Sequence, residues 1–147
     1  MIERILVLAI ITVFVALAVV VARAWTANRL IGLRARGGDR LWSALGAKPD
    51  GRPSLVVFST PSCAACRTAQ QPAVETVAAR FGPALRVLKV DLAERPAIGH
   101  AFNVLTAPTT VVLAGDGRLG NINHGFAPAD QLSAQLSAVG VSPASLR

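Results

Sequence analysis

One stretch of the chain joins an apolar segment directly to a pair of cysteines: residues 55–66 read LVVFSTPSCAAC. Leu55 to Ser59 is short, apolar and rich in β-branched residues, which predicts a buried strand. Beyond the cysteines, apolar residues recur at helical spacing, with Pro72 inside the pattern as an expected kink. Cys63 and Cys66 therefore sit where a buried strand gives way to a helix, and this junction decides the fold class.

The spacing of Cys63 and Cys66 is ambiguous by itself, because a C-x-x-C pair occurs both in metal sites and in redox sites. At the start of a helix, backbone amides stabilise a thiolate at Cys63 and lower its pKa. Cys66 lies one turn further along, so its sulfur can reach that of Cys63. This arrangement suits thiol–disulfide exchange, in which Cys63 attacks and Cys66 resolves the mixed disulfide. An inert cysteine pair is the alternative.

A metal site built on the cysteines would need the two histidines as further ligands. His100 and His124 follow Cys66 by 34 and 58 residues, without the short spacing of a ligand pair. Each histidine is better interpreted as a surface or loop residue. We therefore expect no metal and no other cofactor.

The remaining periodicity predicts an α/β domain. The order of elements is helix, strand, helix, strand, helix, strand, strand, helix, which favours a mixed central sheet with helices on both faces. A glycine-rich turn at 115–117 predicts that the last two strands form a hairpin. The predicted helices cover residues 40–45 (with Asp39 as N-cap), the segment from the cysteines to about 81, 98–102 and 128–139, and the predicted strands cover 55–59, 85–90, 109–113 and 119–122.

Three short pieces of sequence resemble the thioredoxin family over roughly residues 39–140. The first is Cys63-Ala64-Ala65-Cys66 between a strand and a helix. The second is Thr106-Ala107-Pro108-Thr109, just before a strand, which is similar to the family's cis-proline loop. The third is Gly125, ahead of the last helix. The resemblance implies a thioredoxin-like fold and a redox-active pair, with Cys63 as the nucleophile and Cys66 as the resolving thiol.

The same resemblance implies a substrate-binding edge made of Ala107, Pro108, Thr109 and Gly125. In the family, the backbone beside the proline pairs with an extended segment of the substrate. The Ala107–Pro108 bond is then expected to be cis, although an X-Pro bond taken alone favours trans. Protein thiols and disulfides are the implied substrates, together with an upstream electron donor or acceptor.

Several positions depart from the pattern of thioredoxins proper. Ser62 stands where they carry tryptophan, and Ala64-Ala65 replaces Gly-Pro. Val57 takes the place of a buried acid that helps to deprotonate the resolving thiol. Lys89 has the strand parity to lie near the site, although a solvated lysine at a strand end is the plainer interpretation. Pro72 comes six residues after Cys66, one more than in thioredoxins proper. These departures fit the membrane-anchored thioredoxin-like proteins of bacteria.

The hydrophobic excess of the chain is concentrated near its start. The 147 residues are 52% hydrophobic, and Ile5 to Ala22 contains one polar residue, Thr12, and no charge. As a helix this run is about 27 Å long, close to the hydrocarbon thickness of a bilayer. It predicts one transmembrane helix; a cleaved signal peptide and a buried core helix are the alternatives. We expect an anchor at 1–23, a basic juxtamembrane linker at 24–38, the thioredoxin-like domain at 39–140 and a tail at 141–147.

The net charge of +7 is also uneven. Five arginines lie within residues 23–40, against Asp39 alone. By the positive-inside rule the domain is cytoplasmic on a single-pass membrane protein, with export as the alternative. Basic residues beside a membrane indicate contact with anionic lipid, and no basic stripe with stacking aromatics points to nucleic acid.

The combined prediction is a membrane-tethered thiol–disulfide oxidoreductase acting on protein substrates through Cys63 and Cys66. Two alternatives use the same residues differently. A redox-silent docking or assembly module would keep the fold without the chemistry, and a metal-handling protein would use the cysteines as ligands.

Overall fold

The computed structural model describes residues 38–141. The predicted anchor at 1–23, the predicted linker apart from Gly38, and the predicted tail apart from Val141 lie outside the described residues. Within the described part, no helix combines the length and the apolar character that crossing a membrane requires. Val141 itself is buried in the hydrophobic cluster that contains Leu55 and Val77.

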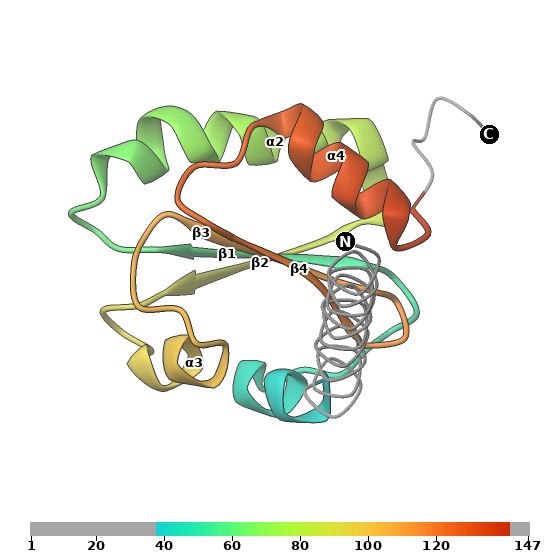
Figure 1. Cartoon of the computed structure of the whole chain (residues 1–147), viewed down its shortest axis with the longest axis horizontal. Coiled ribbons are helices and arrows are strands. Elements are labelled where there is room, and N and C mark those ends of the chain that lie inside the picture. Colours follow the sequence, from blue (N-terminus) through green and yellow to red (C-terminus); the bar gives the residue numbers. More distant parts are fainter. Residues whose placement is uncertain (1–37, 142–147) are drawn as a thin grey trace, which may run out of the picture. The chain divides into compact units, whose positions relative to one another are not determined.

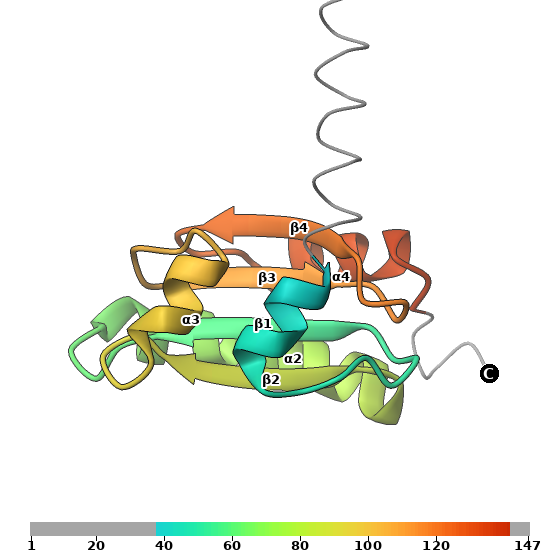
Figure 2. The ribbon, with the colours of Figure 1, turned by 90° about the horizontal axis from the view of Figure 1, so that it is seen from below.

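Four strands form a mixed sheet: β1 (Ser54–Ser59), β2 (Arg86–Asp91), β3 (Thr109–Leu113) and β4 (Leu119–His124). Their order across the sheet is β2-β1-β3-β4 (Figure 2). β1 runs parallel to β2 and antiparallel to β3, and β3 and β4 form an antiparallel hairpin. The mixed sheet and the hairpin predicted from the sequence are both confirmed.

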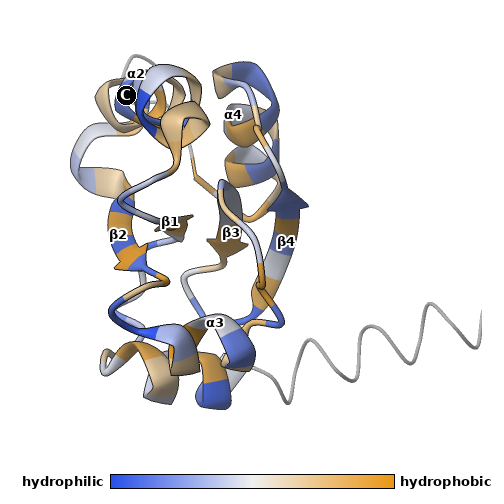
Figure 3. Ribbon diagram, turned by 90° about the vertical axis from the view of Figure 1, so that its left-hand side faces the viewer, coloured by the Kyte–Doolittle hydropathy of each residue, from blue (hydrophilic) through white to orange (hydrophobic). Residues whose placement is uncertain are grey.

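Helices cover both faces of this sheet (Figure 1). α2 (Gln71–Phe81) and α4 (Ala129–Ala138) lie on one face, and the helix at 38–45 and α3 (Pro96–Ala101) lie on the other. A separate hydrophobic core fills each interface, one containing Leu55 and Val77 and the other containing Phe58 and Phe102. Figure 3 shows the two helical layers edge-on, with the strands between them. The predicted three-layer α/β arrangement is therefore confirmed.

The helix at 38–45 differs in one detail from its prediction. Asp39 lies within the helix and is not its N-cap, since residue 38 is already helical. The helix is held to the sheet through Trp42, which is buried and whose Nε1–H donates to the carbonyl of Gly117 at 3.1 Å. Gly117 has φ +89° in the β3–β4 turn, a conformation that favours glycine. The Arg86 guanidinium lies 5.7 Å from the centre of the Trp42 ring.

The helix after the cysteines is irregular near Pro72, as predicted, and the irregularity is a π-helical turn. Cys66–Gln70 is a π-helical turn, in which the N–H of Gln71 bonds to the carbonyl of Cys66, and α2 follows it. Pro72 lies in the first turn of α2, directly after the π turn, and its missing N–H interrupts the series of backbone hydrogen bonds there. A π turn holds more residues than an α turn. It therefore accommodates the extra residue that separates Cys66 from Pro72.

Candidate active site

The sheet register brings three distant segments to one edge. Phe58, near the end of β1, pairs with Thr109 at the start of β3, and Thr109 pairs with His124 at the end of β4. The cysteine motif follows β1, Pro108 precedes β3 and Gly125 follows β4. Antiparallel pairing therefore collects these three loops at the same edge of the sheet.

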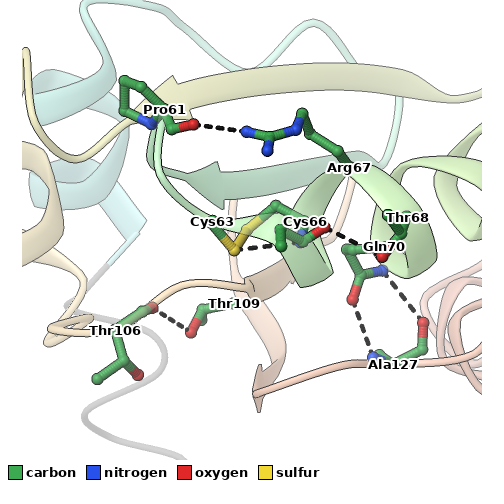
Figure 4. The surroundings of a disulfide bond; sticks show 10 residues. Pro61, Cys63, Cys66, Arg67, Thr68, Gln70, Thr106, Thr109 and Ala127 are labelled. Carbon is green, nitrogen blue, oxygen red and sulfur yellow. Dashed lines mark hydrogen bonds between the residues drawn. A yellow bond between two sulfur atoms is a disulfide. The ribbon is translucent and has the colours of Figure 1, made fainter.

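Cys63 and Cys66 are joined by a disulfide, with an S–S distance of 2.07 Å and a Cα–Cα distance of 5.3 Å (Figure 4). The backbone N–H of Cys66 donates to Sγ of Cys63 at 3.1 Å. A hydrogen bond from an amide at the start of a helix stabilises negative charge on that sulfur in the reduced form. Cys63 is half-buried, whereas Cys66 is only 7% exposed. The more exposed cysteine is thus also the one whose sulfur is placed to carry the charge.

The Ala107–Pro108 peptide bond is cis, as the resemblance implied. The carbonyl of Pro108 accepts a hydrogen bond of 2.9 Å from the N–H of Gly125, which joins the loop before β3 to the loop after β4. Thr109 Oγ1 donates to the carbonyl of Thr106 at 2.8 Å, and both threonines belong to the surroundings of the disulfide (Figure 4). The residues predicted for the site therefore lie in or next to loops at one edge of the sheet.

Gln70 is a site residue that sequence reasoning missed. Its side chain is 1% exposed and pairs with both backbone groups of Ala127 (Figure 4). Nε2 donates to the carbonyl of Ala127 at 3.1 Å, and the N–H of Ala127 donates to Oε1 at 2.9 Å. Gln70 is separated from the buried residues Val74 and Val77 by four and seven positions, so it lies on the apolar face of the helix. A polar residue on an apolar helix face is the sequence signal that could have identified it.

Arg67 forms a second contact across the motif that the sequence did not indicate. Its Nη1 donates to the carbonyl of Pro61 at 2.6 Å, and the side chain is exposed. The contact links the helical segment after Cys66 to the loop before Cys63. It also places a positive charge beside the cysteine pair.

A cavity of about 440 Å³ lies between β1, β2 and α2, with Cys66 on its wall. Val57 and Lys89 are paired in the β1–β2 register, and both line the cavity. Lys89 is also exposed to solvent. The carboxylates on the cavity wall are those of Glu75 and Asp91, from α2 and the end of β2.

The two histidines lie in different elements of the fold. His100 lies in α3 and His124 ends β4, and both are exposed. Within residues 38–141 no three His, Cys, Asp or Glu side chains are grouped as a metal site requires. The carboxyls with a lowered pKa, Asp50 and Asp116, are each hydrogen-bonded by an arginine two residues further on. They lie in the turns before β1 and after β3, at the opposite edge of the sheet.

Comparison with known proteins agrees with this geometry. Residues 45–138 match the family model described as Thioredoxin. A thioredoxin of Alicyclobacillus acidocaldarius subsp. acidocaldarius is 32% identical over 88 residues, which cover 60% of this chain and 82% of that protein.

Two solved structures illustrate the likeness in fold. A mutant thioredoxin from Halobacterium salinarum NRC-1 has a TM-score of 0.55 and 28% identity, covering 62% of this chain and 77% of its own. MTB dsbF, solved in mixed oxidized and reduced forms, has a TM-score of 0.52 and 20% identity, covering 60% of this chain and 81% of its own.

Proposed function

Because the chain belongs to the thioredoxin family and is a thiol–disulfide redox enzyme, we propose that it is a membrane-tethered reductase of protein disulfides. The observation that carries the proposal is the cysteine pair at the start of a helical segment. There, Sγ of Cys63 accepts the N–H of Cys66, and Cys63 is the more exposed of the two cysteines. A stabilised, accessible thiolate is what attack on a disulfide requires.

In the first step, the Cys63 thiolate attacks one sulfur of the substrate disulfide. A mixed disulfide forms between Cys63 and the substrate, and the other substrate sulfur leaves as a thiolate that takes a proton from solvent. In the second step, the Cys66 thiolate attacks Sγ of Cys63, the internal disulfide forms and the second substrate thiolate leaves. Two electrons pass from the enzyme dithiol to the substrate, and a dithiol donor then returns the enzyme to its reduced form.

The proposed role of Ala107, Pro108, Thr109 and Gly125 is to hold the substrate segment beside Cys63. The Gly125–Pro108 hydrogen bond and the Thr109–Thr106 hydrogen bond support this role, because they fix the backbone of the loop before β3. A fixed edge offers an extended peptide a preformed partner for backbone pairing.

Reduction of insulin by the full-length chain with dithiothreitol tests the activity. We expect Cys63→Ser to abolish the catalysed rate. Reduced Cys66→Ser, mixed with insulin after removal of dithiothreitol, should accumulate a mixed disulfide that added dithiothreitol releases. Equal rates for wild type and Cys63→Ser would overturn the proposal.

The proposed tether rests on the sequence of Ile5 to Ala22, and the proposed cytoplasmic placement rests on the arginines that follow it. Anionic lipid is the proposed partner of that basic segment. A membrane-impermeant thiol reagent applied to intact cells tests the placement. Cys63 should be labelled only after lysis, whereas labelling without lysis would put the domain on the outside.

A docking module without redox chemistry is the second candidate, and the residue type at position 57 favours it. Val57 lines the same cavity as Cys66 and is paired with Lys89. A valine side chain cannot accept the proton of the Cys66 thiol. The thiol pKa of Cys63 separates the two candidates, since a docking module needs no thiolate at neutral pH. A Cys63 pKa near 8.5, the value of an ordinary cysteine, would favour docking.

A further inference from the structure

Two side chains break the general rule that large hydrophobic residues are covered. Among the described residues, Leu105 is 72% exposed and Phe126 is 52% exposed, and no other large hydrophobic side chain is comparably open. Both belong to the loops that form the edge around Cys63. We propose that Leu105 and Phe126 select substrates whose cysteine is flanked by large apolar residues, a specificity that rests on the proposed function.

Leu105 is carried by the loop that leads to Pro108. The residue before it, Val104, is buried, and its N–H bonds to the carbonyl of Gly99 at 2.7 Å. The residue after it, Thr106, accepts the hydroxyl of Thr109. Leu105 is therefore exposed on a loop that is fixed on both sides.

Phe126 is held in the same way at the end of β4. Gly125 bonds to Pro108 on one side, and Ala127 is clamped by the buried side chain of Gln70 on the other. An aromatic ring that projects from so constrained a backbone loses little freedom on binding a partner. The Gly125–Pro108 bond also joins the two loops, so that Leu105 and Phe126 belong to one continuous edge.

Next to Cys63 and Cys66, residues 60–68 contain a single charged side chain, that of Arg67. Pro61, Ala64 and Ala65 are exposed around Cys63, and the charged side chain of the motif, Arg67, is hydrogen-bonded to the carbonyl of Pro61. Binding of a charged segment to an apolar surface is unfavourable, because the charged groups lose water. Binding of an apolar segment is favourable, because apolar surface on both partners is buried. The reactive sulfur restricts the partner further, because it must present a disulfide to Cys63. The occupant is thus an extended protein segment with apolar residues next to its cysteine.

The test uses the reduced full-length chain and two synthetic peptides of equal length. Each carries one cysteine as a thiopyridyl disulfide, flanked by Leu and Phe in one peptide and by Ser on both sides in the other. Attack by the Cys63 thiolate forms the enzyme–peptide disulfide and expels pyridine-2-thione, whose absorbance reports the single-turnover rate. Dipyridyl disulfide, which has no peptide, reports the intrinsic reactivity of Cys63.

We expect wild type to react about tenfold faster with the apolar peptide than with the polar one, the scale of discrimination that one apolar contact provides. The double variant Leu105→Ser, Phe126→Ser should react with both peptides at rates within about twofold, and with dipyridyl disulfide as wild type does. The conservative double variant Leu105→Met, Phe126→Leu should keep the preference.

Equal rates with both peptides in wild type, or an unchanged preference in the serine variant, would overturn the inference while leaving the redox function intact. If the redox function itself were wrong, the chain would react with none of the three disulfides faster than free cysteine does. A concentration-dependent dimer that the serine variant loses would assign the edge to a second copy of the chain. Phosphatidylcholine vesicles that protected Cys63 from dipyridyl disulfide in wild type, and not in the serine variant, would assign the edge to lipid. Either the dimer or the lipid result would overturn the inference.

Discussion

The side chain of Gln70 and the backbone of Ala127 form two hydrogen bonds, of 3.1 and 2.9 Å, across 57 residues of sequence. Gln70 ends the π-helical turn that begins at Cys66, and Ala127 lies two residues after Gly125. The pair therefore ties the helical segment that carries the resolving cysteine to the loop that borders the proposed substrate edge.

Replacement of Gln70 by alanine should lower the free energy of unfolding by about 2–4 kcal/mol, because it leaves the N–H and the carbonyl of buried Ala127 without partners. The neighbouring Gln71→Ala provides a matched control, since Gln71 is exposed and its side chain bonds to Glu75 on the same helix. Its effect should stay within about 0.5 kcal/mol. Urea unfolding followed by circular dichroism measures both, and equal effects would show that the clamp contributes nothing.

The reactivity of Cys63 should depend on pH as that of a stabilised thiolate does. We expect its pKa to lie below the value of about 8.5 for free cysteine, because the N–H of Cys66 donates to its sulfur. The rate of alkylation by iodoacetamide should rise through that lowered pKa and then reach a plateau. In Cys63→Ser, the buried Cys66 should be alkylated more slowly at every pH, and an equal rate would contradict the proposed division of roles.

Introduction of a carboxylate at position 57 should accelerate the second chemical step. Val57 lines the same cavity as Cys66 and faces Lys89, so aspartate there could accept the proton of the Cys66 thiol. We expect Val57→Asp to speed the decay of the mixed disulfide by about tenfold in stopped-flow experiments. It should also cost about 1–3 kcal/mol of stability, because a polar group enters a buried position.

The uncharged variant Val57→Asn is the control for that experiment. It has a similar size and polarity but cannot take up the proton as a carboxylate does. If Val57→Asn accelerated the decay as much as Val57→Asp, proton transfer would not be the cause.

Acid should remove the stabilisation supplied by Asp50. The side-chain hydrogen bond from Arg52 is the main cause that lowers the pKa of the Asp50 carboxyl, and the Arg52 N–H adds to it. Because the pKa is lower in the folded chain than in the unfolded one, the pair stabilises the fold above the unfolded value of about 3.9. That contribution disappears as the pH falls through the folded pKa.

Comparison of wild type with Asp50→Asn across a pH series measures this effect. The two unfolding curves should differ at pH 7 and converge in acid. Asp116→Asn should behave alike, because Arg118 lowers the pKa of Asp116 in the same way. A difference that persisted in acid would mean that the ionised carboxylates are not its source.

The sequence predicted the elements well where the signal is local. The strands at β1 and β3 and the turn at 115–117 follow from apolar runs and glycines, and their observed positions agree with the prediction to within about two residues. The form of the break near Pro72 could not be predicted, because a π turn and an α kink satisfy the same local pattern. Asp39 was wrongly interpreted as an N-cap for a related reason: its residue type suits a cap, but neighbouring residues decide where the helix begins.

The candidate site shows the same division. The exchange chemistry of the cysteine pair was predictable from its position between a predicted strand and a predicted helix, and the cis bond at Pro108 from family resemblance. The roles of Ala107, Pro108, Thr109 and Gly125 in substrate binding stay predictions. Gln70 was missed, since nothing in the sequence shows that Ala127 needs its amide.

The α/β class, the order of the strands along the chain and the position of Cys63 and Cys66 between a strand and a helix follow from the amino-acid sequence. These features depend on residues within a few positions of each other, so periodicity and spacing reveal them. The fold is needed to show that the motif, Pro108 and Gly125 meet at one edge, that Gln70 is buried there, and that Leu105 and Phe126 remain open beside it. Those facts depend on the register of strands that are far apart in sequence, which sets Phe58, Thr109 and His124 in one row. The burial of Gln70 and the exposure of Leu105 and Phe126 follow from that pairing, which no local sequence pattern encodes.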